Sequence, residues 1–128
     1  MRAHTLGVIG IMNTEQANEF ADHWIESWNN HDLDQIMSHY TEDFEMSSPV
    51  IISAMNEPSG TLKGKDVIRV YWSKALAKYT DLKFEKHHVL VGANSVTIIY
   101  NGVRGLSAES FHFNKAGKVF AAYAHYDL

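Results

Sequence analysis

The chain has 128 residues, of which 45% are hydrophobic and 20% are charged. That length corresponds to about one domain that buries roughly two-thirds of its unfolded surface, enough for a core without disulfides or structural metals. There is no cysteine, and eleven basic against fifteen acidic residues give a net charge of −4. This composition excludes disulfide frameworks, zinc–thiolate sites and cysteine nucleophiles, and it provides no basic field for nucleic acid.

A short N-terminal leader and one domain are expected. Residues 1–12 form the leader, disordered or loosely docked, and residues 13–128 form the domain. The apolar stretch from Leu6 to Met12 is too short and too weakly charged to indicate a secretory signal, and a translation start at Met12 stays open. No segment approaches the roughly 18 consecutive apolar residues of a membrane span. We therefore expect a cytoplasmic protein that does not contact a membrane.

Two helices are predicted near the start of the domain. Asn13 can cap the first, with Gln16 three positions later in an arrangement close to a capping box, and Asn29-Asn30-His31 ends it. Asp32 caps the second helix, and Tyr40 is expected to be the last of its residues that face the core. Residues recurring at helical spacing give the first helix one wide apolar face: Ala17, Phe20, Ala21, Trp24, Ile25 and Trp28.

A third helix is predicted from about Lys65 to Tyr79. Gly64 precedes it, and Asp66 in its first turn suits the helix dipole. Its apolar side consists of Val67, Val70, Tyr71, Ala75 and Leu76. Residues 47–61, which contain both prolines, are expected to be irregular.

The second half of the chain predicts a sheet. Phe44, Met46 and Ser48 share one face of a short strand, and four longer strands follow the third helix. These are Leu82 to Val91, Ser95 to Val103, Gly105 to Asn114 and Lys118 to Asp127. Short Gly and Asn connections between alternating runs indicate antiparallel hairpins. Helices followed by a meander predict an α+β fold, with helices on one face of a curved antiparallel sheet.

One carboxyl group is expected in apolar surroundings. Glu109 shares a strand face with Ser107 and two phenylalanines, and such a face disfavours the charged form and raises the pKa. The group can then donate a hydrogen bond while protonated, or act as a base near neutral pH. Alternatively, Glu109 lies near a sheet edge and pairs with Lys118 or Arg104.

Aromatic side chains dominate the expected interior, and a packed core accounts for most of them. They are Trp24, Trp28, Tyr40, Phe44, Tyr71, Trp72, Tyr100, Phe111, Phe113 and Tyr126. The last strand places Ala122 and Ala124 on one face with Phe120, leaving volume for a cavity. All of these rings except Tyr40 are expected to line the ligand site, together with Met46, Ser48, Ala122 and Ala124. Tyr40 is expected to assist Glu109 in catalysis through its hydroxyl group.

The other face of the last strand is also mostly apolar. It carries Val119, Ala121, Tyr123 and His125. A strand buried on both sides in a small α+β domain needs a second cover. This predicts a homodimer formed through the outer face of the sheet.

Metal and cofactor chemistry are not expected. The chain has eight histidines, but the adjacent His87 and His88 should point to opposite faces and no H-E-x-x-H pattern occurs. A metal site would need His87, His39 or His125 to converge. There is also no G-x-S-x-G elbow and no phosphate-binding loop.

A series of short motifs follows in order over about residues 13–127. They are Trp28-Asn29-Asn30-His31-Asp32-Leu33-Asp34, Tyr40-Thr41-Glu42-Asp43-Phe44, Ser48-Pro49, Leu62-Lys63-Gly64-Lys65-Asp66, the run from Phe111 to Val119, and His125-Tyr126. Their order and spacing resemble the nuclear transport factor two-like superfamily, particularly its SnoaL-like polyketide-cyclase and ketosteroid-isomerase branches. The resemblance implies a cystatin-like α+β barrel: a cone of curved antiparallel sheet closed by three helices around a deep pocket, dimeric through its outer face.

The resemblance carries over the isomerases' site residues only in part. Ser48 stands where they have their general-base aspartate, and a serine cannot take a proton from carbon. Their oxyanion-hole tyrosine falls at Trp24, and their second oxyanion-hole acid falls at Glu109. The supporting tyrosine of the second helix matches Tyr40, and its partner on the third helix is Trp72. Steroid isomerisation is therefore not expected.

Two other branches of the superfamily match less well. Its epoxide hydrolases place an arginine two residues before an interior aspartate, where this sequence has Ser107 before Glu109. Its cyclases use an acid-base aspartate on the last strand, for which Asp127 near the end of the sequence is the nearest candidate. Neither pattern is reproduced.

The expected function is binding of a small, mostly apolar molecule that carries a carbonyl or hydroxyl group. As an enzyme, the protein would be a cofactor-free isomerase, lyase, cyclase or dehydratase. Glu109 would polarise the oxygen or move the proton, helped by Tyr40 and Tyr126. The alternative is a non-catalytic ligand-binding or dimerisation domain, which Ser48 at the position of the base favours.

Overall fold

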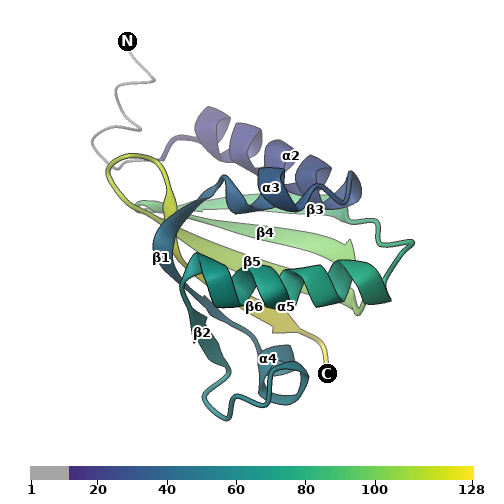
Figure 1. The fold of residues 1–128 in the computed structure, drawn as a ribbon. Coiled ribbons are helices and arrows are strands. Elements are labelled where there is room, and N and C mark those ends of the chain that lie inside the picture. The colour runs from purple at the N-terminus through teal and green to yellow at the C-terminus, as the bar shows by residue number, and fades with distance from the viewer. Residues whose placement is uncertain (1–11) are drawn as a thin grey trace.

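Helices and strands are mixed up to residue 78, and strands alone follow from residue 85 onwards (Figure 1). The computed structural model describes residues 12–128. Its helices are α2 (Thr14–Asn29), α3 (Leu33–Met37), α4 (Pro49–Ala54) and α5 (Lys65–Lys78). Its strands are β1 (Tyr40–Ser47), β2 (Thr61–Lys63), β3 (Glu85–Gly92), β4 (Ser95–Gly102), β5 (Gly105–Phe113) and β6 (Val119–Tyr126). The predicted α+β class is confirmed.

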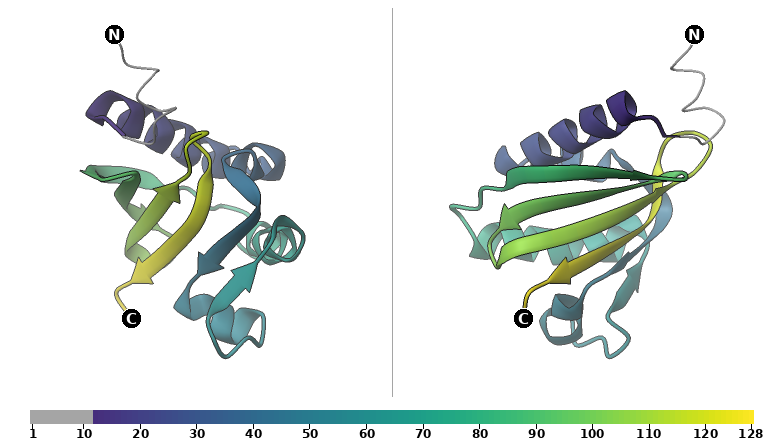
Figure 2. Two further views of the ribbon diagram at one scale, coloured as in Figure 1. Left: turned by 90° about the vertical axis from the view of Figure 1, so that its left-hand side faces the viewer. Right: turned by 180° about the vertical axis from the view of Figure 1, so that it is seen from behind.

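The described strands form one curved six-stranded sheet in the order β2-β1-β6-β5-β4-β3. β1 and β6 run parallel, and the other neighbouring pairs are antiparallel. α2 and α5 lie on the same face of the sheet, and in the view from behind the strands lie in front of α5 (Figure 2). The face towards α2 and α5 is called the inner face below, and the opposite face is called the outer face.

Helix α2 begins as the sequence predicts. The Asn13 side chain accepts a hydrogen bond from the Gln16 amide at 2.7 Å, and the Gln16 side chain accepts one from the Asn13 amide at 3.2 Å. This capping box satisfies two backbone donors that the first helical turn leaves free. The helix ends before His31, whose φ of 54° lies in the left-handed region.

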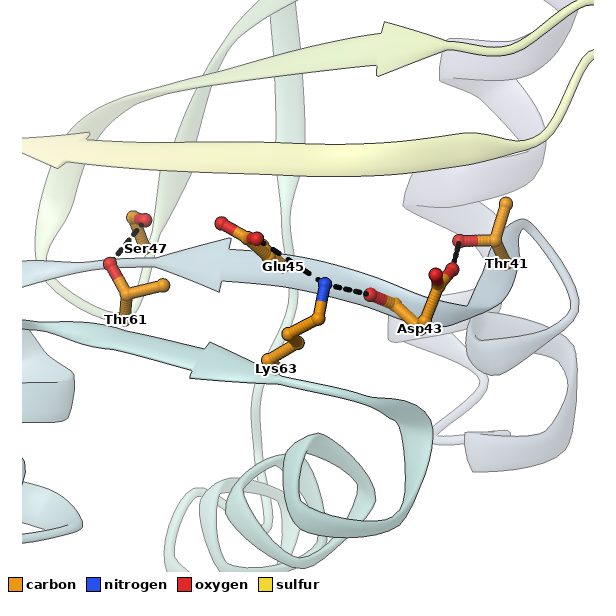
Figure 3. A network of polar contacts seen from close by, with 6 residues as sticks. All are labelled: Thr41, Asp43, Glu45, Ser47, Thr61 and Lys63. Atoms are coloured by element: carbon orange, nitrogen blue, oxygen red, sulfur yellow. Dashed lines mark hydrogen bonds and ion pairs between the residues drawn. The ribbon is translucent and has the colours of Figure 1, made fainter.

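Polar contacts hold the edge strand β2 against β1 (Figure 3). The hydroxyl groups of Ser47 and Thr61 lie 2.8 Å apart. The Lys63 ammonium lies 3.4 Å from the Glu45 carboxylate and donates to the Asp43 carbonyl at 3.3 Å. Because a three-residue edge strand makes few backbone hydrogen bonds, these side-chain contacts help to fix its register.

Helix α3 is shorter than predicted. It ends at Met37, and Tyr40 is the first residue of β1 rather than the last inward position of the helix. The reason is non-local: the backbone amide of Val119 donates to the His39 carbonyl at 2.9 Å, which joins this part of the chain to β6. Tyr40 nevertheless faces the core and is 2% exposed.

The proline-containing segment at residues 47–61 is more regular than predicted. It contains helix α4, whose first position is Pro49 and whose cap is Ser48. The Ser48 hydroxyl oxygen accepts a hydrogen bond from the Val50 amide at 3.1 Å. Proline suits the first helical position because it lacks only an N–H that would have no partner there. The segment thus encodes a helix start.

The range predicted for the third helix matches α5, but its predicted apolar side is partly wrong. Val70 is 50% exposed. The buried positions are Ile68, Tyr71 and Trp72, which follow the i, i+3, i+4 spacing of one helix face.

A β-bulge changes the predicted face of Phe120. In the pairing of β5 with β6, His112 lies opposite Ala121 while Phe113 lies opposite Val119. Phe120 is therefore an extra residue, which interrupts the alternation of the two faces. It is 47% exposed instead of sharing the inner face with Ala122.

Most of the expected leader, residues 1–11, lies outside the described residues. Met12 is described, and it is half-buried against the core. No helix of the described part of the chain is long and apolar enough to cross a membrane.

Candidate functional site

A pocket of about 280 Å³ lies between the helices and the inner face of the sheet. Trp24 and Trp28 come from α2, Tyr71 and Trp72 from α5, and Tyr100 from β4. All three tryptophans of the chain thus line it. The remaining lining residues are Met46, Val50, Ser53, Ala54, Lys74, Ala75, Lys78, Tyr79, Leu82, Phe84, Val103, Arg104, Glu109 and Tyr126.

Glu109 is the acidic residue of the pocket. It lies in β5 opposite Ile98 of β4 and Ala124 of β6, well inside the sheet, and it is 4% exposed. Burial in these apolar surroundings raises its pKa to about 8, while a hydrogen bond from the Tyr100 hydroxyl, long at 3.5 Å, opposes that rise. The carboxyl group is therefore mostly protonated at neutral pH. The alternative of an edge position with a basic partner is wrong.

The Tyr40 hydroxyl lies behind the pocket wall. It accepts a hydrogen bond from Trp24 Nε1 at 3.0 Å, and Tyr40 is not among the lining residues. Burial, and secondarily the charge of Glu109, raise the pKa of Tyr40 well above its usual value. This hydroxyl therefore remains neutral and holds the indole ring that forms the wall.

Two further tyrosine hydroxyls, those of Tyr71 and Tyr126, belong to residues that line the pocket. Burial raises the pKa of both, and interaction with the Ser48 side chain opposes the rise. Both groups are neutral at physiological pH and can donate hydrogen bonds. Ser48 itself is buried and caps α4, and it does not line the pocket.

Phe84 is an important wall residue that the sequence analysis missed. It packs on Trp24 and Trp28 with ring centroids 5.5 Å apart in each case, and on Tyr100 at 4.8 Å. Phe84 precedes β3, which begins at Glu85, although the predicted strand from Leu82 to Val91 included it. Its backbone is clamped by the side chain of Asn29, which accepts from the Phe84 amide at 2.6 Å and donates to its carbonyl at 3.0 Å.

The predicted catalytic and ligand-lining residues divide into two groups. Eight line the pocket: Trp24, Trp28, Met46, Tyr71, Trp72, Tyr100, Glu109 and Tyr126. Seven others are buried without lining it: Tyr40, Phe44, Ser48, Phe111, Phe113, Ala122 and Ala124.

Phe20 explains part of this division. Its ring packs edge-on against Phe111 and Phe113, with centroids 4.9 Å away in each case. The inner face is therefore filled beyond Glu109, and the pocket occupies the other end of β5. Periodicity identified the face correctly but could not tell which part of it is hollow.

Spacing on α5 could have indicated further lining residues. Lys74 and Lys78 follow Tyr71 at intervals of three and seven residues, which places them on the same side of the helix. They are exposed, as is Arg104 in the β4–β5 turn. These three cations mark the part of the pocket that meets solvent, which is called the mouth below.

A second hollow, of about 360 Å³, lies near the first turns of α2 and the ends of the hairpins. Its lining includes His23, His39 and Glu19. Burial lowers the pKa of His39, which favours the neutral ring. In the described part of the chain, no three His, Asp or Glu side chains are grouped closely enough to hold a metal ion.

Comparison with known proteins agrees with this fold. The model of the SnoaL-like domain family matches residues 21–127, and the chain belongs to this family. A SnoaL-like protein of unknown function from Burkholderia thailandensis E264 is 45% identical, with a TM-score of 0.89 over 92% of this chain and 99% of that one. No curated protein matches the chain.

Two more distant solved structures share the fold alone. The epoxide hydrolase/cyclase-like enzyme SalBIII, described in pyran ring formation in the polyether salinomycin, is 17% identical, with a TM-score of 0.73 over 91% of this chain and 95% of that one. A protein of unknown function with a cystatin-like fold from Methylobium petroleophilum PM1 is 12% identical, with a TM-score of 0.73 over 92% of this chain and 80% of that one. The predicted family and the cystatin-like fold are confirmed.

Proposed function

We propose that this protein binds a small, mostly apolar molecule through a carbonyl or hydroxyl oxygen that faces Glu109. The observation that carries the proposal is a neutral carboxylic acid in an aromatic pocket, with a pKa of about 8 and 4% exposure. A protonated carboxyl donates a hydrogen bond, and it does so strongly where little water competes.

The other polar groups of the inner pocket support an oxygen acceptor on the ligand. Tyr100 and Tyr126 have raised pKa values, so their hydroxyls stay protonated. Trp28 Nε1 is buried and has no hydrogen-bond partner among the described residues. A buried donor without an acceptor costs on the order of 1–3 kcal/mol, and a ligand oxygen that reached it would remove this cost.

The chemistry that we propose is that of a general acid. Glu109 hydrogen-bonds to the ligand oxygen and polarises it, a step shared by cofactor-free isomerases, cyclases and dehydratases. Tyr40 acts as a positioning residue, because its hydroxyl holds Trp24 rather than reaching the pocket.

Binding without turnover is a second candidate function. The observation that favours it is Ser48, which is occupied in capping α4 and does not line the pocket. Glu109 is also the only carboxylic acid among the described lining residues. Proton abstraction from carbon therefore has no separate carboxylate base in this pocket.

Binding can be tested with valerophenone and pentylbenzene, which share a skeleton and differ by one carbonyl group. Trp24, Trp28 and Trp72 line the pocket, so tryptophan emission reports occupancy, and calorimetry gives the dissociation constant. We expect valerophenone to bind more tightly at pH 7, by about tenfold for one well-placed hydrogen bond. The preference should disappear above pH 8 and in Glu109→Leu, and should persist at high pH in Glu109→Gln. Equal binding of both compounds at pH 7 would contradict the proposal.

Titration of Glu109 distinguishes acid chemistry from simple binding. Carbon-13 labelling of glutamate and NMR should show one carboxyl group with a pKa of about 8. The signal is assigned by its loss in Glu109→Gln. A pKa near the usual 4.5 would remove Glu109 as the acid and would favour binding without turnover.

We also propose that two copies of the chain pair through the outer face. Leu106, Phe120 and Tyr123 on this face are 57%, 47% and 40% exposed. Tyr123 lies opposite Ser110 and beside His112, whose ring packs edge-on against it at 5.6 Å. Exposed apolar side chains gathered on a face that no helix of residues 12–128 covers are typical of a protein–protein interface.

A further inference from the structure

The mouth of the pocket carries positive charge that plays no part in the proposed function at Glu109. Lys74 and Lys78 on α5 and Arg104 in the β4–β5 turn all line the pocket, and all three are exposed. Glu109 is the one acidic residue that lines it within the described chain, and its carboxyl group is mostly neutral at pH 7. The mouth is therefore a local positive region on a chain whose net charge is −4.

Four other basic residues have a carboxylate partner, which these three cations lack within the described residues. Lys63, Lys65, Arg69 and Lys86 each pair with a carboxylate. Lys118 donates to the Ser38 carbonyl at 2.8 Å. In the described part of the chain, by contrast, no ion pair involves a cation of the mouth.

The partners that the mouth cations do have are aromatic rings. Lys78 Nζ lies 5.3 Å from the centre of the Tyr79 ring, and the Arg104 guanidinium carbon lies 6.0 Å from the centre of the Tyr126 ring. Tyr79 and Tyr126 both line the pocket. These contacts keep the two charges beside the pocket and leave their hydrogen-bond donors available for an anion.

We infer that the ligand of this pocket is an apolar carboxylic acid, bound with its oxygen-bearing apolar part against Glu109 and its carboxylate at Lys74, Lys78 and Arg104. This inference rests on the proposed function and adds the class of ligand. A carboxylate suits the site better than a phosphate dianion, because Lys74 and Lys78 lie in the C-terminal half of α5, where the helix dipole disfavours a large negative charge.

The test extends the pair of ketone probes by two acids. 4-Benzoylbutyrate is valerophenone with its terminal methyl group replaced by a carboxylate, and 5-phenylpentanoate is the same acid without the ketone. At low salt and pH 7 we expect 4-benzoylbutyrate to bind about tenfold more tightly than valerophenone, since each exposed ion pair contributes up to about fivefold and more than one cation faces the carboxylate. The advantage should shrink to about twofold in 0.5 M salt, because salt screens exposed charges.

Variants locate the charge effect. In the double variant Lys74→Gln/Arg104→Gln, the advantage of 4-benzoylbutyrate over valerophenone should fall severalfold, because Lys78 is then the one mouth cation that remains. Lys115→Gln is the matched control: Lys115 is exposed in the β5–β6 turn, away from the pocket, and its loss changes the net charge without changing the mouth. This variant should keep the wild-type preference for the acid.

The four probes separate the two proposals. If valerophenone binds as tightly as 4-benzoylbutyrate, or if the double variant keeps the preference for the acid, the inferred carboxylate is wrong. The proposed function then still stands as long as ketones bind more tightly than their ketone-free analogues. If both acids bind tightly but 4-benzoylbutyrate has no advantage over 5-phenylpentanoate, the role of Glu109 is wrong while the charged mouth is supported. Absence of binding by all four probes would overturn both proposals.

Discussion

The two faces of strands β5 and β6 show opposite placements of polar and apolar groups. On the inner face, Glu109 is a carboxylic acid among mostly apolar neighbours, and it is 4% exposed. On the outer face of the same strands, Leu106 and Tyr123 are apolar side chains that are 57% and 40% exposed. The carboxylic acid would cost less free energy on the solvent-exposed outer face, and the apolar side chains would cost less on the buried inner face. A buried acid and an exposed apolar group both reduce stability, and both are features on which function can depend.

Side-chain alternation determines which face of the sheet a residue lies on, but it does not determine whether that residue is polar or apolar. Glu109 lies inside because its strand position leaves it no other face, and the structure accommodates it as a neutral acid. Tyr123 lies outside for the same reason, one strand away and opposite Ser110. The inner face is the one that we propose to bind a small molecule, and the outer face is the one that we propose to pair with a second copy of the chain.

The largest expected effect is the pH dependence of stability that Glu109 confers. Its pKa is about 8 in the folded chain and near 4.5 in the unfolded chain. Between these values the unfolded chain ionises first, so the free energy of unfolding falls as the pH rises. The loss levels off above pH 8 at a value on the order of 5 kcal/mol. Urea unfolding of wild type and Glu109→Gln at pH 5, 7 and 9 measures it.

Glu109→Gln should lack most of this decline, because a glutamine does not ionise. The same substitution at the exposed Glu26 on α2 provides a control and should keep the wild-type dependence. Parallel pH profiles for wild type and Glu109→Gln would show that the acid is charged in the folded protein, and the contrast between the two faces would then be wrong.

Two phenylalanines on opposite faces give the next largest difference. Phe111 is fully buried against Phe20 and Trp24, and Phe111→Ala should cost about 3–5 kcal/mol. Phe120 is 47% exposed, and Phe120→Ala should cost about 1 kcal/mol or less. Chemical unfolding at low protein concentration, where any dimer dissociates, compares them. Equal costs would mean that the outer face is covered within one chain.

Local patterns predicted much of this arrangement because they depend on neighbouring residues alone. The capping box at Asn13 and the inner-face position of Glu109 both follow from spacing within one element. The features that were not predicted depend on partners far away in sequence. Tyr40 joins a strand because β6 pairs with the chain there, and Phe120 turns outward because of a bulge in the pairing of β5 with β6.

The extent of the pocket was the least predictable feature for the same reason. Phe111 was expected to line it, but the Phe20 ring fills that end of the inner face. Phe84 was missed although the residue that fixes it, Asn29, lies in the motif that supports the family resemblance. Asn29 in that motif thus positions Phe84, a wall residue that lies 55 residues later in the sequence.

A smaller effect is expected for association through the outer face. Tyr123→Asp places a charge where the proposed dimer excludes water, and it should weaken the dimer by about tenfold or more. Val70→Asp on α5 is the matched control, because Val70 is also exposed, at 50%, and lies on a helix away from the outer face. Sedimentation velocity over a range of concentrations measures both. A dimer that resists Tyr123→Asp, or a wild-type chain that stays monomeric, would leave the outer face without the proposed partner.

The smallest expected effect concerns the contact between Tyr100 and Glu109. Because the hydroxyl lies 3.5 Å from the carboxyl oxygen, Tyr100→Phe should change the free energy of unfolding by only about 0.5 kcal/mol or less. The pKa of Glu109 should rise further, since this hydrogen bond favours the charged form. NMR titration of the labelled carboxyl group detects the change, and Tyr123→Phe on the outer face should not produce it. A fall in the pKa of Glu109 would contradict this prediction. It would mean that the Tyr100 hydroxyl stabilises the neutral form of Glu109 instead of the charged form.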